Sequence, residues 1–262
     1  MENILEIIIA NKKKEVEELK KQFKLSDFEK SLNFGNKVSS ISGAIRSKDF
    51  GIIAEIKRKS PSAGDMRQEV NPIEIAKSYV ESGMAGISIL TDYDFFGGTN
   101  DDVIQVKKHF SVPVLRKEFI VDEIQIFESK AIGADAILLI AEVLTAKQVR
   151  EFTIIAKSLG LEVIMELHDF QQLDKFYDEI DILGVNNRNL KSQKTSLETS
   201  FQLAPFLPKD VLKISESGIK TVEEIKILSS LNYNGALIGE SILKNPEMDL
   251  FLQQLKQLTH EG

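Results

Sequence analysis

The stretch GIIAEIKRKSPSAG, residues 51–64, begins as an apolar strand and ends in charged side chains. Glu55 and Lys57 are two residues apart, so on an extended chain they share a face with Ile53. If Ile53 points into a buried interior, the carboxylate and the ammonium point into its mouth. We interpret them as an acid–base pair aimed at a ligand, and a structural ion pair is the alternative.

Polar side chains end four further apolar runs of the sequence. Lys117 follows VLR, Glu166 ends VIME, Asn186 ends LGVN and Glu216 ends ISE. One charged residue at a strand end is usually a solvated loop residue. Five strands that end in Glu, Lys or Asn instead predict a shared site, in which acids and bases exchange protons with a substrate.

Two turns late in the chain indicate a phosphate site. SESGIK places Ser217 and Gly218 after one apolar run, and LIGESIL places Gly239 and Glu240 after the next, before a short helical segment. Free backbone N–H groups at such turns and helix starts attract anions. With Lys57 and Ser60 across from them, these turns predict a phosphate cradle.

The elements that must position these residues alternate regularly. Eight β-rich runs read as strands, at 51–56, 86–90, 113–116, 135–140, 161–166, 181–186, 211–216 and 235–239, and amphipathic stretches with caps at Asn71, Thr145 and Thr221 read as helices. Eight strand–helix units predict an α/β fold of the (β/α)8 type, a TIM barrel, whose chemistry lies at the carboxyl ends of its strands. A doubly wound open sheet is the alternative, but no G-x-G-x-x-G turn follows the first strand.

The whole chain, residues 1–262, is expected to form one barrel domain, because its length suits a single large core. Residues 1–45 precede the first strand and read as a helical extension, in ILEIIIANKKKEVEELKKQF and then LSDFEKSLN. This extension is expected either to cover the barrel or only to stabilise it.

Composition excludes several classes of function. The formal net charge of −7 argues against a surface for nucleic acid or an anionic membrane. Cysteine is absent, and the three histidines are far apart, so we expect no disulfide, thiol nucleophile or metal site. No signal peptide or long apolar span is evident, which predicts a cytoplasmic protein.

Taken together, the motifs resemble those of indole-3-glycerol phosphate synthase. The segments that carry the resemblance run in order from about residue 40 to residue 245, namely IIAEIKRKSPSAG, VLRKEFIVD, VIMELHD, GVNNRNL, ISESGI and LIGESIL. The resemblance implies a cyclising decarboxylation and dehydration of 1-(2-carboxyphenylamino)-1-deoxyribulose 5-phosphate in tryptophan biosynthesis. It implies a phosphorylated small-molecule substrate and no cofactor.

The resemblance also implies a role for each site residue. Lys117 would be the general acid of ring closure, its pKa lowered by a cationic, partly desolvated mouth, with Glu118 behind it as an orienting partner. The second acid and the base would come from Glu55, Lys57 and Glu166, an assignment that stays open because coupled groups share protons. The remaining residues would hold the substrate: Asn186 and Glu216 its polar groups, Phe96 and Phe119 its aromatic ring between them, and Ser60, Ser217, Gly218, Gly239 and Glu240 its phosphate, with Arg188 bracing the site.

Two other functions fit parts of this pattern. An Amadori isomerase on a related barrel, such as phosphoribosylanthranilate isomerase, would use a cysteine base on the first strand, where this chain has Glu55. A barrel that only binds a phosphorylated metabolite would keep the phosphate cradle and lose the acids and bases. We expect a monomer.

Overall fold

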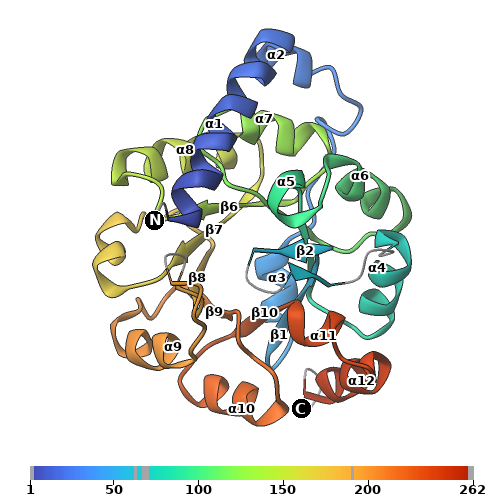
Figure 1. Ribbon diagram of the computed structural model, residues 1–262, viewed down its shortest axis with the longest axis vertical. Helices are drawn as coiled ribbons and strands as arrows, with labels where there is room; N and C mark the ends of the chain where they lie inside the picture. Colours follow the sequence, from blue (N-terminus) through green and yellow to red (C-terminus); the bar gives the residue numbers. More distant parts are fainter. Residues whose placement is uncertain (1–2, 62–63, 67–70, 190–191, 259–262) are drawn as a thin grey trace.

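A closed barrel of eight parallel strands forms the centre of the protein in a computed structural model that describes residues 3–61, 64–66, 71–189 and 192–258 (Figure 1). Around the barrel the strands follow one another in chain order, and β1 closes the ring by pairing with both β4 and β10. The barrel strands are β1 (Gly51–Ile56), β4 (Gly86–Leu90), β5 (Val114–Lys117), β6 (Ala136–Ile140), β7 (Glu162–Leu167), β8 (Ile182–Asn186), β9 (Leu212–Glu216) and β10 (Gly235–Ile238). The predicted TIM barrel and its eight strands are confirmed.

Parallel pairing aligns the carboxyl ends of the strands at one rim. Asn186 at the end of β8 is the register partner of Glu216 at the end of β9, and Leu90 of β4 is the partner of Lys117 of β5. Glu166 of β7 pairs with Gly184 of β8. The rim is therefore the place where the polar strand ends of the sequence meet.

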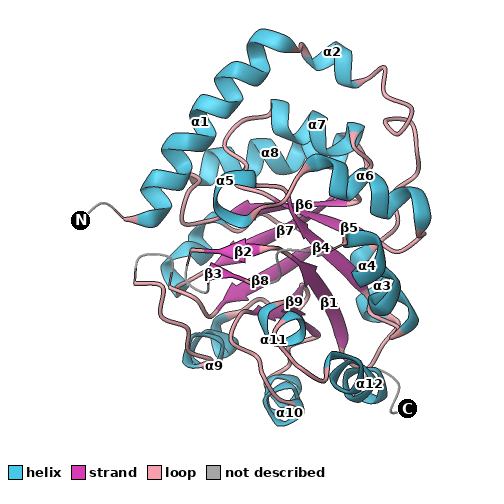
Figure 2. Ribbon diagram, turned by 45° about the vertical axis from the view of Figure 1, so that its right-hand side comes forward, coloured by secondary structure: helices cyan, strands magenta, loops and turns pink. Residues whose placement is uncertain are grey.

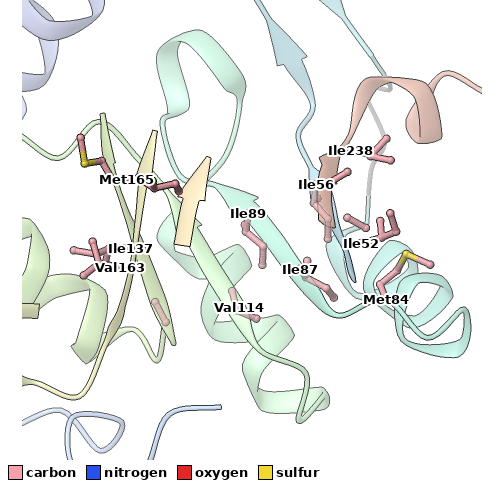
Figure 3. Close-up of a cluster of buried hydrophobic side chains, with 14 of the residues drawn as sticks. Ile52, Ile56, Met84, Ile87, Ile89, Val114, Ile137, Val163, Met165 and Ile238 are labelled. Atoms are coloured by element: carbon pink, nitrogen blue, oxygen red, sulfur yellow. The ribbon is translucent and has the colours of Figure 1, made fainter. Parts of the chain in front are cut away.

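Side chains alternate along each strand and so build two cores. The inward set fills the barrel and includes Ile53, Leu115, Leu138, Ile164 and Ile214. The outward set packs under the surrounding helices, and Figure 3 shows part of it, including Ile52, Ile56, Ile87, Ile89 and Met165. Strands buried on both faces explain why these runs are apolar at nearly every position.

Helices surround the strands and supply the crossovers (Figures 1 and 2). α4 begins after the N-cap Asn71, whose side chain accepts from the Ile73 N–H, and α8 and α10 begin with capping boxes at Thr145 and Thr221. These three predicted helix starts are confirmed. The helices that follow the first strand are α4 (Pro72–Glu81), α5 (Tyr93–Phe96), α6 (Asn100–His109), α7 (Ile124–Ala131), α8 (Ala146–Ser158), α9 (Glu198–Leu203), α10 (Val222–Ser230), α11 (Glu240–Leu243) and α12 (Met248–Leu258), with 3-10 turns at Phe170–Lys175 and Ala204–Phe206.

The N-terminal extension touches both ends of the barrel. α1 (Ile4–Gln22) crosses the rim, where Leu5 and Ile8 join the inner core, and it lies along one side of the molecule in Figure 2. α3 (Ile41–Arg46) closes the opposite end, because Ile45 packs directly against Gly51 at the start of β1. α2 (Leu25–Phe28) is shorter than the stretch 25–33 that the sequence predicts as helical.

A small antiparallel hairpin, β2 (Lys59–Ser60) with β3 (Gly64–Asp65), follows β1 and was not predicted. Ser62 of the first motif lies between these strands but outside the described residues. The hairpin places the buried Ser60 beside the rim. In the described part of the chain, no helix has the length and apolar character needed to cross a membrane.

A buried ammonium ties α1 to the barrel. The Lys12 Nζ lies 3.1 Å from Glu118 and 3.1 Å from Asp92, and both carboxylates are fully covered. Glu15 on the next turn of α1 completes its coordination at 2.6 Å. Since each carboxylate depends on this cation, the contact fixes where α1 lies over the rim.

Replacing this lysine therefore tests how strongly the extension is held. Lys12→Ala should lower the free energy of unfolding by about 3 kcal/mol, because it removes the ion-pair partner of two buried carboxylates. Urea unfolding followed by circular dichroism measures the loss. Lys13→Ala, which removes an exposed lysine from the same helix, is the matched control; equal stabilities of the two variants would contradict the prediction.

Candidate active site

A single ammonium links three strands at the rim. Lys117 at the end of β5 donates to Glu166 of β7 at 2.8 Å and to Glu216 of β9 at 2.5 Å. The two carboxylates are 3% and 1% exposed, and the lysine side chain is 13% exposed. In the sequence Lys117 is 49 residues from Glu166 and 99 residues from Glu216, yet the three side chains form one hydrogen-bonded triad that lines a pocket.

The charge around Lys117 differs from the sequence-based expectation. Burial disfavours its ammonium, but the carboxylates of Glu166, Glu216 and Glu55 outweigh burial and hold the pKa of Lys117 above its ordinary value. The predicted lowering of this pKa is wrong, because the mouth around the lysine is anionic and not cationic. In the free site the lysine is a charged hydrogen-bond donor.

The two carboxylates of the triad are driven apart in proton affinity. Burial and the neighbouring Glu166 charge raise the pKa of Glu216 despite its contact with Lys117. Burial also disfavours the Glu166 carboxylate, yet Lys117, His168 and the Asn186 amide together hold the pKa of Glu166 below its ordinary value. Two carboxylates that share one cation titrate as a unit, with the first proton going to Glu216.

Glu55 and Lys57 form the pair that the alternation on β1 predicted. The Lys57 Nζ lies 2.5 Å from the Glu55 carboxylate, and both side chains line the pocket. A Cβ at Gly239 would lie 2.7 Å from this carboxylate, so the residue that directly follows β10 must be glycine for Glu55 to fit. The pair is an ion pair, as in the alternative reading, but it also faces the pocket.

Asn186 and Arg188 hold the β8 edge of the pocket. The Asn186 side-chain oxygen accepts from the Arg188 N–H at 3.0 Å, and its amide donates to Glu166. The Arg188 guanidinium lies 3.1 Å from Glu240 at the start of α11. This contact agrees with a bracing role for Arg188, and it turns the Glu240 carboxylate toward a cation.

A second, smaller hollow adjoins the pocket beside the loops after β9 and β10. Ser217 and Gly218 both adopt left-handed backbone angles, with φ of 66° and 78°, which is uncommon for serine. A Cβ at Gly218 would lie 2.6 Å from Thr195, so the tight turn requires glycine there. The hollow is lined by the predicted phosphate residues Ser217, Gly218, Gly239 and Glu240, together with Lys57, Arg188 and Ser241.

Phe96 and Phe119 form one aromatic wall of the pocket. Their ring centroids are 6.0 Å apart and their planes are tilted by 35°. The expected arrangement, with a substrate ring between them, has no room at this separation because the two rings contact each other. The apolar wall continues with Ile4, Leu5 and Ile8 of α1.

Glu118 has different partners from those expected. It accepts from the Thr91 hydroxyl at 2.7 Å and from the Phe119 N–H at 2.8 Å, and it pairs with Lys12. The carboxylates in contact with Lys117 are those of Glu166 and Glu216, so the predicted orienting contact of Glu118 with Lys117 is wrong. Neighbouring residues on a strand point to opposite faces, which the sequence pattern already implied.

Sequence reasoning missed two residues near the rim, Lys12 and His168. His168 follows Glu166 by two positions and so shares its face, the same signal that identified Lys57 beside Glu55. Lys12 carried no such signal, because one lysine in a run of three on an exposed helix looks like its neighbours. Only the packing of α1 shows that it is buried.

Comparison with known proteins gives the family. The family described as indole-3-glycerol phosphate synthase matches residues 5–255. The chain belongs to the indole-3-glycerol phosphate synthase family. A relative of that name from Bacteroides thetaiotaomicron is 43% identical over 253 residues, covering 97% of each chain, and one from Chlorobium limicola is 40% identical over 244 residues, covering 92% of this chain and 95% of its own.

Solved structures support the fold of this synthase family member more broadly. A mutant tryptophan synthase alpha-subunit from Pyrococcus furiosus aligns with a TM-score of 0.61 at 17% identity, over 80% of this chain and 98% of its own. Thiamine phosphate pyrophosphorylase from the same organism aligns with a TM-score of 0.58 at 11% identity, over 81% and 96%. At such low identity the likeness extends to the barrel fold alone.

Proposed function

We propose that this chain converts 1-(2-carboxyphenylamino)-1-deoxyribulose 5-phosphate to indole-3-glycerol phosphate, CO2 and water. The proposal rests above all on the triad, in which one buried ammonium faces two carboxylates of unequal proton affinity. The triad lies between an aromatic wall and a hollow bordered by the two late turns. Family membership supports the same reaction.

Ring closure needs a proton donor at the substrate carbonyl. As the aromatic carbon attacks the carbonyl carbon, the carbonyl oxygen becomes basic, and the Lys117 ammonium protonates it. The surrounding carboxylates keep this lysine charged before substrate binds. A substrate oxygen that takes the place of one carboxylate contact weakens that hold and eases release of the proton.

The later steps need one more acid and one base. Loss of CO2 leaves its bonding electrons on the ring, and departure of the hydroxyl group as water requires a second proton. Glu55, Lys57 and Glu166 supply the acid and the base. Glu55 is paired with Lys57 and Glu166 with Lys117, and these ion pairs leave several ways to share the protons. Ring closure, loss of CO2 and loss of water need no group or electrons from outside the substrate besides protons, so no cofactor enters the proposal.

The remaining residues bind the substrate under this proposal. Asn186 and Glu216 hold its polar groups, while Phe96 and Phe119 together cover one face of its aromatic ring. The phosphate binds in the smaller hollow, at the backbone N–H groups of the turns after β9 and β10. Ser60, which lines the adjoining pocket, is its remaining proposed ligand. Arg188 pairs with the Glu240 carboxylate and so offsets its negative charge beside that anion.

Of the alternative functions, the isomerase has the least support. The first strand carries Glu55, paired with Lys57, where that reaction would use cysteine, and the chain has no cysteine. A barrel that only binds a phosphorylated metabolite has no need for the buried Lys117 triad. We also propose that the protein acts as a monomer in the cytoplasm; a dimer mass in analytical ultracentrifugation would contradict the first part.

Removing the proposed acid tests the chemistry. Lys117→Ala should lower kcat by about 10²- to 10⁴-fold, the usual contribution of a general acid. The measurement is the fluorescence of the indole product formed from the carboxyphenylamino substrate, an assay that also separates the synthase from both alternatives. Lys157→Ala, which removes a lysine paired with Asp181 on the outside of the barrel, is the control. Near-normal turnover of Lys117→Ala would exclude this lysine as the acid.

A charge placed in the late turn tests the phosphate position. Ser217→Asp should raise KM by at least about tenfold, because its carboxylate would repel the substrate phosphate. Ser217→Asn is the matched neutral control, and both residues tolerate the left-handed backbone that this position requires. Equal KM values for the two variants would place the phosphate elsewhere.

A further inference from the structure

His168 lies directly behind the triad, and the proposed mechanism gives it no role. It follows the last residue of β7 and points to the same side as Glu166, two positions earlier. Its side chain is only 9% exposed. A buried imidazole next to a reacting carboxylate is a candidate for a role in proton transfer.

The imidazole faces the outer oxygen of Glu166. The Nε2 lies 3.4 Å from Oε1, whereas Oε2 is the oxygen that accepts from Lys117. Within the described ranges, neither ring nitrogen has a hydrogen-bond partner. Because unsatisfied buried polar groups are costly, such a ring indicates a contact that tightens in another state of the site.

The charges of the triad explain what that contact would do. Glu166, Glu216 and Glu55 are three carboxylates against the two ammonium groups of Lys117 and Lys57. If Lys117 delivers its proton to the substrate, Glu166 loses its nearest cation. The carboxylate would then bind a proton itself and could no longer act as a base.

We propose that His168 is a positioning residue, which donates a hydrogen bond from its imidazolium to Oε1 of Glu166 and keeps that carboxylate ionised while Lys117 is neutral. The imidazolium replaces the lost cation on the opposite side of the carboxylate. The contact also leaves Oε2 aimed at Lys117. This inference rests on the proposed role of Lys117 as the acid, and it takes Glu166 as the base among the three residues that share the later steps.

The other groups around His168 are already engaged. Its backbone N–H donates to the Gln172 side chain at 2.8 Å, and Gln172 in turn donates to Glu142 and Asp169. Lys117 of β5 donates to Glu216 of β9 and to Glu166, and Glu166 is the carboxylate that His168 faces. Glu166 is therefore the carboxylate through which a charge on this imidazole acts.

Two substitutions of His168 test whether its side chain acts as a hydrogen-bond donor or only fills space. His168→Gln keeps an N–H near the position of Nε2, whereas His168→Leu keeps only bulk. We expect kcat to fall by about tenfold in His168→Leu and by less in His168→Gln, with KM nearly unchanged in both. His109→Gln is the matched control, because His109 is exposed and bonded to the Gln105 carbonyl of α6.

The pH profile of kcat distinguishes the two roles, because a purely structural role of His168 would not affect its shape. The base must be ionised, so activity is lost as pH falls through the pKa of Glu166. His168 is one of the groups that lower this pKa, so its removal raises it. In His168→Leu the acid limb should therefore move to higher pH, and in His168→Gln it should move less.

Two results would overturn the inference: an unchanged kcat in His168→Leu, or a kcat lowered by one factor at every pH with the acid limb in place. The second result would indicate packing damage alone. These outcomes are distinguishable from failure of the proposed function, which the wild-type protein and Lys117→Ala report in the same product assay.

Discussion

The buried ammonium of Lys117 is the interaction on which the site depends. Its Nζ contacts both Glu166 and Glu216, whose carboxylates are almost completely covered. Without it, two like charges would face each other in a low-dielectric interior, and at least one would have to bind a proton. The arrangement is costly for stability and useful for chemistry, because it sets up groups whose protons can be moved by small changes in contact.

Such a triad requires a scaffold that places distant segments within ångströms. The closed barrel does so, because parallel strands all end at one rim and glycines allow side chains to fit across it. A Cβ at Gly184 would lie 2.1 Å from the Glu216 carboxylate, and one at Gly239 would lie 2.7 Å from that of Glu55. The strand pattern and these two glycines therefore serve the same purpose, which is to give carboxylates room in a packed interior.

The sequence predicted the parts of this structure that depend on local pattern. Strand runs, helix caps and the face shared by Glu55 and Lys57 follow from the period of the side chains and from capping chemistry, so they were recognisable without coordinates. The sign of the Lys117 pKa shift, the partners of Glu118 and the burial of Lys12 depend on residues far away in sequence. These three properties could not be predicted, because the residues that contact these side chains are identified only in the folded structure.

The hairpin after β1 and the short α2 show a similar limit. Residues 25–33 have a helical composition, yet only Leu25–Phe28 form a helix before the chain turns away. Lys59 and Ser60 pair with Gly64 and Asp65, although no strand pattern in the sequence marks either segment. Short elements of this kind are decided by packing and turn geometry more than by propensity.

The two anchor points of the N-terminal extension have a consequence for biosynthesis. This segment leaves the ribosome before the barrel strands, but Lys20 bonds to Asp122, 102 residues later, and Ser40 bonds to Glu162, 122 residues later. Leu5 and Ile8 therefore have no partners until the barrel strands that they pack against have been synthesised. The extension can pack against the two ends of the barrel only late in folding, through long-range contacts. Until then the apolar face of its first helix stays uncovered in the nascent chain and can promote aggregation.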